Sequence, residues 1–348
     1  MARRPASAIN VLFASVGRRV ELMRCFRRAY HTLGLAGNIV GVDVDPLAPA
    51  LQVVDRPYLV PRLSSPDYVP TLVEICQRER VAAIFPLIDE NIPPLVCHRE
   101  LIEATGARIS VVSAQAAQLT ADKWQTTQFF RSLGLATPAT WLPRDFDPAG
   151  ASYPLFLKPR GGNGGKDTHR VDNARELEFF LDHVPDPLIQ ELLPGPELTN
   201  DVVSDLDGTL LGIASRQRIE VRAGEVAKGV TVRDPGVLAA CARIAAALPA
   251  VGPITVQCMM RDGVPHYTEI NARLGGGIPL AIAAGMDAPL LLLARTAGLP
   301  IDIPALGSYQ TGLYVTRFDD SFLLTESQRA QLASRALAIS SRLEPQSP

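Results

Sequence analysis

Glu269 and Asn271 stand two residues apart in the stretch YTEINARLGGG (267–277) and are the first candidates for chemistry in this sequence. Residues two apart on a strand point to the same face, so these side chains present a carboxylate and an amide oxygen together. Such oxygens are hard ligands that suit Mg²⁺. The three glycines at the end of the stretch let backbone approach a bound ligand closely. From this stretch alone, a metal site and a surface strand with a flexible turn remain open alternatives.

The residues just before this stretch favour the metal site. The apolar runs ITVQCMM (254–260) and VPHYTEI (264–270) are separated by Arg261-Asp262-Gly263, and Asp-Gly between such runs is a strong hairpin signal. The hairpin would place Gln257 roughly opposite Glu269. A core hairpin should not bury Gln, Glu and Asn side chains together unless something binds them. We therefore predict a divalent cation that also holds a phosphate, with the ligands Gln257, Glu269 and Asn271.

A glycine-rich loop follows a second predicted strand in the stretch YPLFLKPRGGNGGKDTHRV (153–171). Its glycines expose backbone N–H groups that can surround phosphate oxygens. The lysines at either end, Lys158 and Lys166, add positive charge for the same phosphates. The loop is not a Walker A motif, because GxxxxGK[ST] does not occur here. Together with the candidate Mg²⁺ site, it predicts phosphate binding rather than a solvated hairpin tip.

A third stretch, PLIQELLPGPELTNDVV (187–203), has the character of a hinge. A short apolar run and a Pro-Gly-Pro turn lead to Glu197 and Thr199 at the start of another strand. Backbone groups of such a connector can bind an adenine edge, and a carboxylate just beyond it can accept hydrogen bonds from ribose. Taken by itself, the stretch would be no more than a turn.

The three stretches, in this order, resemble the ATP-grasp superfamily from about Lys123 to Arg273. PGPELT resembles D-alanine–D-alanine ligases, whereas TVQCMM…YTEINARLGGG is similar to carbamoyl phosphate synthetase large subunits. VLFASVGRR and the segment 216–232 resemble small stand-alone ATP-grasp proteins of the carbamoyl phosphate synthase-like, carboxylate–amine ligase type. The motifs are specific for the superfamily but not for a substrate. The chain departs from carbamoyl phosphate synthetases in having one ATP-grasp unit and no evident glutaminase or ammonia-tunnel partner domain.

The resemblance implies roles for residues of this chain. ATP would be held by Lys123, Lys158, Arg160, Gly161, Gly162, Gly164, Gly165, Lys166, Gln190, Glu191, Leu193 and Glu197. Mg²⁺ would be held by Gln257, Glu269 and Asn271, with two ions expected and Mn²⁺ as an alternative metal. Catalysis would use Arg273, Lys158, Arg218 and Lys228, although Arg218 and Lys228 equally suit a solvated hairpin. The hinge position is often Glu in the family and is Gln190 here, which leaves open whether Gln190 or Glu191 faces adenine.

The N-terminal part of the chain alternates apolar strands with helices, which predicts an open parallel sheet. Ligands bind such sheets at the carboxyl ends of the strands. The strand ends there carry Gly17, Arg18, Asp43, Asp45, Asp89 and Glu90. We expect Gly17, Arg18, Asp89 and Glu90 to bind the organic substrate together with Gly275, Gly276 and Gly277, although each strand-end residue also suits an ordinary solvated loop. No GxGxxG follows the first strand, so a nicotinamide dinucleotide site is not predicted.

Composition limits the classes of function. The chain has 348 residues, of which 47% are hydrophobic and 20% charged, with a net charge of −2. This balance argues against a nucleic-acid or polybasic membrane contact, and no apolar run is long enough for a membrane span. The five cysteines show no metal-type spacing and are expected to be buried thiols. We expect a cytoplasmic protein, with a homodimer as one option.

We predict an α/β fold, α+β in the ATP-grasp part, in which a Rossmann-like domain precedes a two-subdomain ATP-grasp fold. The predicted parts are the Rossmann-like domain (1–114), a small subdomain with the phosphate loop (115–188), a large subdomain with the Mg²⁺ site (189–310) and a C-terminal segment (311–348). The predicted function is ATP-dependent ligation of a carboxylate to an amine through an acyl phosphate, with an amino-acid-like substrate. The alternatives are bicarbonate activation, as in carbamoyl phosphate synthases, and nucleotide binding without catalysis.

Overall fold

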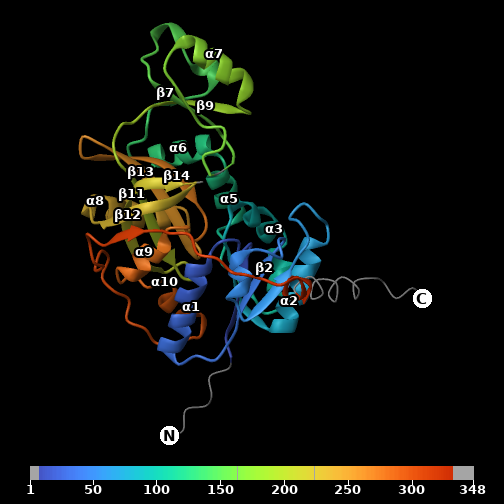
Figure 1. Ribbon diagram of the computed structural model, residues 1–348. Helices are drawn as coiled ribbons and strands as arrows, with labels where there is room; N and C mark the ends of the chain where they lie inside the picture. The colour runs from blue at the N-terminus through green and yellow to red at the C-terminus, as the bar shows by residue number, and fades with distance from the viewer. Residues whose placement is uncertain (1–7, 163, 223, 332–348) are drawn as a thin grey trace.

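The computed structural model describes residues 8–162, 164–222 and 224–331 and arranges them around three β-sheets (Figure 1). Most helices lie beside the parallel sheet or the larger antiparallel sheet, whereas α7 (Ala174–His183) sits with the small sheet at one end of the molecule. The mixed α/β architecture confirms the predicted fold class.

The N-terminal sheet is parallel throughout, with the strand order β3-β2-β1-β4-β5. Continuous apolar runs form its central strands because both faces of the sheet are covered. The strands are β1 (Asn10–Ala14), β2 (Ile39–Asp43), β3 (Arg56–Leu59), β4 (Val81–Pro86) and β5 (Arg108–Ile109). The helices here are α1 (Val20–Leu33), α2 (Tyr68–Glu79), α3 (Ile92–Cys97), α4 (Arg99–Glu103) and α5 (Ala114–Ala121), with the 3₁₀ turns η1 (Pro49–Gln52) and η2 (Asp89–Asn91).

The small sheet is antiparallel, with the order β6-β9-β7-β8, and packs against α7. Its strands are β6 (Thr140–Trp141), β7 (Leu155–Pro159), β8 (His169–Val171) and β9 (Pro187–Glu191), with the 3₁₀ turns η3 (Pro143–Asp145) and η4 (Pro148–Gly150). The predicted domain boundary at residue 188 lies inside β9. The preceding helix α6 (Lys123–Ser132) begins at the N-cap Asp122, whose carboxylate accepts from the backbone N–H of Trp124.

The large sheet has the order β14-β13-β10-β11-β12-β15, and every neighbouring pair is antiparallel. Its strands are β10 (Glu197–Ser204), β11 (Leu210–Arg222), β12 (Glu225–Val232), β13 (Pro253–Arg261), β14 (Val264–Asn271) and β15 (Tyr314–Thr316). The associated helices are α8 (Pro235–Ala247), α9 (Ile278–Ala283) and α10 (Ala288–Thr296). The edge strand β15 belongs to the segment predicted to lie outside the subdomain.

The parallel sheet and the large sheet share one continuous hydrophobic core, which includes Phe13, Phe85, Ile213 and Tyr267. Helix α1 packs directly against α10, and this contact joins the two parts. The small sheet instead has a separate core, which includes Leu157 and Ile189. The N-terminal domain and the large subdomain are therefore joined as a unit to which the small subdomain is attached.

Two composition-based expectations can be checked against the described residues. Four cysteines are buried thiols, as expected, but Cys97 is exposed because it ends the short helix α3 at the surface. No helix in the ranges that the structure describes is long and apolar enough to cross a membrane.

Candidate active site

A cavity of about 690 Å³ opens between the three sheets and gathers most of the predicted site residues. Its volume suits a nucleotide with part of a second substrate. The predicted residues that line it are Asp89, Glu90, Lys123, Lys158, Gly161, Gly162, Gly164, Gly165, Lys166, Gln190, Glu191, Leu193, Glu197, Arg218, Gln257, Glu269, Asn271, Arg273, Gly275, Gly276 and Gly277.

Four predicted site residues do not line the cavity. Gly17 donates its backbone N–H to the Asp43 carboxylate, and Arg18 is exposed. Arg160 is held by the carboxylate of Asp122. Lys228 is exposed and pairs with Glu220, so it matches the solvated-hairpin alternative rather than the phosphate role.

In the hairpin of β13 and β14, Gln257 lies opposite Glu269 as predicted, but the register shifts by one residue between Cys258 and Gln257, so that a bulge at Thr268 produces this pairing. Asp262 and Gly263 both have positive φ, as a tight two-residue turn requires. The Asn271 amide lies 3.3 Å from Oε1 of Gln257, so these side chains meet on one face. Among the described residues, no hydrogen bond or ion pair is recorded for the Glu269 carboxylate.

This donor set fits a magnesium ion. A half-buried carboxylate without a protein partner, beside two amides, offers the hard oxygen ligands that Mg²⁺ prefers. Glu197 is a fourth oxygen-bearing group, but it already accepts from Arg218 at 2.7 Å and from the Gln257 amide. Glu197 therefore serves to orient Gln257 and Arg218 in this structure.

Lys158 ends strand β7 and points its ammonium into the cavity from the small sheet. Burial lowers the pKa of Lys158 to about 8, while the nearby Glu269 carboxylate opposes that effect and Lys123 adds to it. No hydrogen bond from its ammonium to a protein acceptor is recorded within the described ranges. A buried lysine without a hydrogen-bonded acceptor suits the binding of an anion.

The glycine-rich loop is anchored at its start to helix α6. Lys123 donates its backbone N–H to the Arg160 carbonyl at 2.9 Å and its ammonium to the Gly162 carbonyl at 2.7 Å. Gly164 and Gly165 both adopt positive φ, which explains why glycine is used there. The loop thus places backbone N–H groups and Lys123 near one wall of the cavity.

The hinge end of the cavity is more apolar, with Phe156, Leu193 and Met259 in its lining. The two carboxylate oxygens of Glu191 are occupied by the Ala139 N–H at 2.8 Å and by Arg261 at 2.7 Å. Gln190 donates its amide to Thr140 at 2.8 Å, and no donor to its Oε1 is recorded among the described residues. The contacts therefore leave Gln190 as the better acceptor for an adenine amino group.

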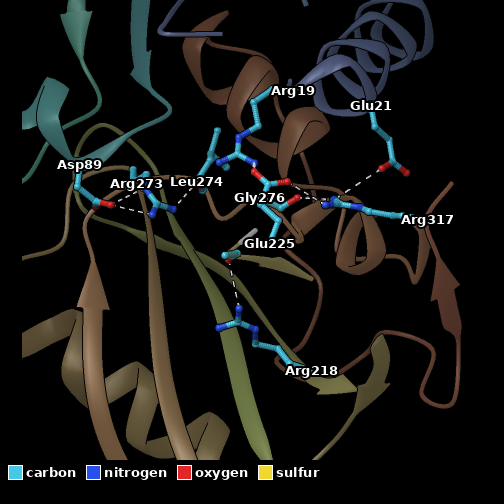
Figure 2. A network of polar contacts seen from close by, with 10 residues as sticks. Arg19, Glu21, Asp89, Arg218, Glu225, Arg273, Leu274, Gly276 and Arg317 are labelled. Carbon is cyan, nitrogen blue, oxygen red and sulfur yellow. Dashed lines mark hydrogen bonds and ion pairs between the residues drawn. The ribbon is translucent and has the colours of Figure 1, made fainter. Parts of the chain in front are cut away.

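Arg273 and Asp89 join the large subdomain to the N-terminal domain across the other end of the cavity (Figure 2). The Nη2 and Nε atoms of Arg273 lie 2.7 and 3.0 Å from Oδ2 of Asp89. Burial raises the pKa of Asp89, and the Arg273 guanidinium opposes that shift. The predicted arginine thus faces a predicted substrate residue from another sheet.

The structure adds three charged lining residues that sequence reasoning missed, namely Arg19, Arg216 and Glu225. Arg216 is buried and forms a two-point pair with Asp201, at 2.7 and 3.2 Å. A signal for Arg216 existed, because it lies two residues before Arg218 on one strand and so shares its face. Arg19 and Glu225 carried no such signal, because Arg19 follows a turn and Glu225 is the first residue of strand β12.

The three glycines at 275–277 have a steric reason that the sequence could not reveal. A Cβ on Gly276 would lie 2.3 Å from Nη1 of Arg19, and one on Gly277 would lie 2.3 Å from Nη1 of Arg216. Two guanidinium groups from different sheets therefore rest against this backbone, and any larger residue would displace them.

Comparison with known protein families agrees with this geometry. Residues 120–277 match the ATP-grasp domain, and residues 11–111 match the PylC-like N-terminal domain. The chain therefore contains an ATP-grasp domain that follows a PylC-like N-terminal domain, which confirms the predicted superfamily.

Individual relatives are distant. The chain is 27% identical to the carbamoyl-phosphate synthase of Methanobrevibacter smithii over 44% of this chain and 42% of that protein. It is 23% identical to the 3-methyl-D-ornithine–L-lysine ligase of Methanosarcina barkeri over 79% of this chain and 71% of that protein. The L-amino acid ligase of Bacillus licheniformis has a similar fold, with a TM-score of 0.63, 19% identity and coverage of 83% of this chain and 74% of that chain. The match to the Methanobrevibacter smithii protein thus covers less than half of that relative's length.

Proposed function

We propose that this protein is an ATP-dependent carboxylate–amine ligase that forms an acyl phosphate and releases ADP and phosphate. The observation that carries the proposal is the meeting of Lys158 and Glu269 in one cavity, each without a recorded protein partner among the described residues. A buried cation from the small sheet and a carboxylate from the large sheet are the pair that a metal-bound polyphosphate would bridge. The family match and the ligases among the relatives support the same reading.

ATP would lie along the cavity from the hinge to the metal hairpin. The adenine would pack between the apolar hinge residues and donate to Gln190, while Lys123, Lys158 and the glycine-rich loop would hold the phosphates. Gln257, Glu269 and Asn271 would hold Mg²⁺, which supplies neutralisation of phosphate charge when bound. Glu197 could accept from ribose only by sharing its contacts with Arg218 and Gln257.

The chemistry follows from the weakness of a carboxylate as an electrophile. An oxygen of the substrate carboxylate attacks the γ-phosphorus, and the bond to ADP breaks. The amine then attacks the acyl carbon, phosphate leaves, and the amine loses a proton. The chain's contribution to both steps is positioning and charge neutralisation, with Lys158 at the phosphates and Arg273 beside the carboxylate.

An amino-acid-like substrate is the one that the Asp89 and Arg273 end of the cavity suits best. The Asp89 and Glu90 carboxylates line this end and would face an ammonium group, while the Arg273 guanidinium, which pairs with Asp89 in this structure, would face a carboxylate. These groups come from the N-terminal domain and the large subdomain, which share one core, so their spacing is held by packing. Such a site can select a zwitterion by two oppositely charged contacts.

Phosphate release provides the test. The protein would be assayed with ATP and Mg²⁺ against mixed amino acids, and separately against bicarbonate with ammonia. Amino-acid-dependent release of phosphate is expected. Phosphate release only in the assay with bicarbonate and ammonia would favour bicarbonate activation, the second candidate function, which the similarity to carbamoyl-phosphate synthase supports. Nucleotide binding without release under either condition would replace both with a non-catalytic role.

A further inference from the structure

Arg19 lies at the substrate end of the cavity, where Glu225 and the backbone of Gly276 hold its side chain. It follows the loop after β1, lines the cavity, and has its guanidinium against the backbone of Gly276. Its recorded partner is Oε1 of Glu225, which comes from β12 in the large sheet (Figure 2). Among the described residues, no acceptor is recorded for its Nε and Nη2 groups. Part of its fork of donors is therefore free to bind a ligand.

Glu225 is held from its other side as well. Its second oxygen, Oε2, lies 3.1 Å from Nη1 of Arg317, and Arg317 also donates to the Gly276 carbonyl at 2.6 Å. Arg317 lies outside the cavity lining, whereas Arg19 and Glu225 line it. If Glu225 released Arg19, its carboxylate would still have a cationic partner. The separation of Arg19 from Glu225 therefore does not leave a half-buried charge unpaired.

Burial lowers the pKa of Arg19, with Arg273 and Arg317 acting in the same direction and Glu225 opposing them. Arg19 and Arg273 thus line this end of the site, and Arg317 lies behind Glu225, outside the lining. Their charges are balanced by Asp89, Glu225 and Glu21, the last of which lies 3.9 Å from Arg317. A ligand that brings a carboxylate to Arg19 fits this balance when it also carries an ammonium group.

We propose that Arg19 binds the non-reacting carboxylate of an amino acid that supplies the amine, and that Glu225 occupies this position until the substrate displaces it onto Arg317. This inference rests on the proposed ligase function and adds the class of the amine substrate. The product would then be an amide that keeps a free carboxylate, as in a dipeptide. Arg19 is the specificity-determining residue, and Glu225 is a competing internal carboxylate.

Amino acids and their C-terminal amides provide the probe, because an amide keeps the ammonium group and loses the carboxylate. The twenty standard L-amino acids, L-ornithine and D-alanine would each be compared with the matching amide. Thermal stabilisation in the presence of Mg²⁺ and an ATP analogue reports binding without turnover, and phosphate release gives KM. Wild-type protein should prefer at least one acid over its amide.

Substitutions of Arg19 and Glu225 should change KM for the amino acid in opposite directions. Arg19→Ala should raise KM for the preferred acid on the order of a hundredfold and remove the preference over the amide. Glu225→Gln should lower KM for the acid about tenfold and leave the amide unchanged, because the competitor is gone. Arg317→Ala should raise KM for the acid, because Glu225 would then depend on Arg19 alone. Arg18→Ala is the matched control, since that arginine is exposed and outside the cavity, and it should change neither value.

The failures of the two proposals can be told apart. If phosphate is released but Arg19→Ala keeps the acid-over-amide preference, the carboxylate site is wrong and the ligase function stands. If Glu225→Gln raises KM for acid and amide alike, Glu225 only supports Arg19 and the displacement is wrong. If no acid stabilises the protein more than its amide, the assignment of Arg19 is overturned. Arg19-dependent stabilisation without phosphate release would instead overturn the ligase function alone.

Discussion

The two ends of the cavity are built on supports of different strength. The phosphate end, with Lys158 and the glycine-rich loop, belongs to the small sheet, whose separate core is limited to a few residues such as Leu157 and Ile189. The opposite end is formed by the large sheet and the N-terminal domain, which share one core and are joined by α1 and α10. Figure 1 shows the small sheet with α7 standing apart at one end of the molecule.

The part of the cavity on the small sheet can therefore move, whereas the part on the large sheet and the N-terminal domain is fixed by their shared core. A small subdomain with its own core, joined through a hinge, can change its position at little cost in packing. The metal hairpin and Arg273 cannot move in this way without disturbing the shared core. We infer that nucleotide closes the small subdomain onto a substrate site that is already assembled.

Glu269→Gln should reduce turnover about a thousandfold or more, because the fixed part of the cavity loses the charge that holds the metal and offsets phosphate repulsion. The fold should persist, since the side chain is half-buried and has no recorded protein partner in the described ranges. Phosphate release measures the first effect, and circular dichroism with thermal melting measures the second. Asp262→Asn, at the turn of the same hairpin, is the matched control and should keep wild-type turnover. Near wild-type activity of Glu269→Gln would remove the metal assignment.

Burial lowers the pKa of Lys158 to about 8, so we expect ATP binding to depend on pH. Above that pH the free protein has a neutral Lys158, so KM for ATP should rise about tenfold per pH unit, and Lys158→Met should lose this dependence. For stability, Lys158 is neutral in the folded chain and charged in the unfolded chain between about pH 8 and 10.5. The unfolded state then binds more protons, so the Lys158 contribution to the free energy of unfolding rises with pH through that window. A flat KM profile in the wild type would show that Lys158 does not hold the phosphates.

The glycine-rich loop should exchange its amide hydrogens more slowly when nucleotide binds. Its glycines have many conformations to lose, and the bound phosphates would occupy its N–H groups. Hydrogen exchange of residues 160–162 and 164–166, with and without an ATP analogue, should slow about tenfold on binding. Strands β13 and β14 serve as the internal comparison and should change little. Equal exchange of the loop in both states would contradict its role at the phosphates.

Arg218 and Lys228 allow a paired test, in which the expected changes in KM are the smallest of this set. Arg218 lines the cavity and holds Glu197 at 2.7 Å, whereas Lys228 is exposed and pairs with Glu220. Arg218→Ala should therefore raise KM for ATP about tenfold, since a charge-assisted hydrogen bond at the site is lost. Lys228→Ala should leave both KM and turnover within about twofold, as expected for an exposed pair. The reverse order of effects would return Lys228 to the phosphate site.

The metal hairpin shows what local patterns can predict. Asp-Gly between two apolar runs predicts the turn and the pairing next to it, which runs from Arg261 and Val264 to Cys258 and Tyr267. That pairing alone would set Gln257 opposite Thr268, and a bulge beyond Cys258 brings Gln257 opposite Glu269 instead. The N-terminal alternation of strands and helices similarly predicted the parallel sheet. Arg18 marks the limit, because the sequence could not tell which of two adjacent arginines after the turn faces the cavity. Arg19 is the one that does.

The sequence by itself therefore indicated the elements, the hairpin turn and the set of groups suited to ATP and Mg²⁺, because these depend on residues near one another in the chain. Only the tertiary structure decided which strand ends meet. It brought Arg19, Glu225 and Arg317 together, placed Asp89 against Arg273, and turned Lys228 to solvent. Those contacts join residues far apart in the chain, and their geometry depends on how the sheets pack. The glycines at 275–277 depend on both, because the sequence shows which residues they are and only the tertiary structure shows that two guanidinium groups pack against Gly276 and Gly277.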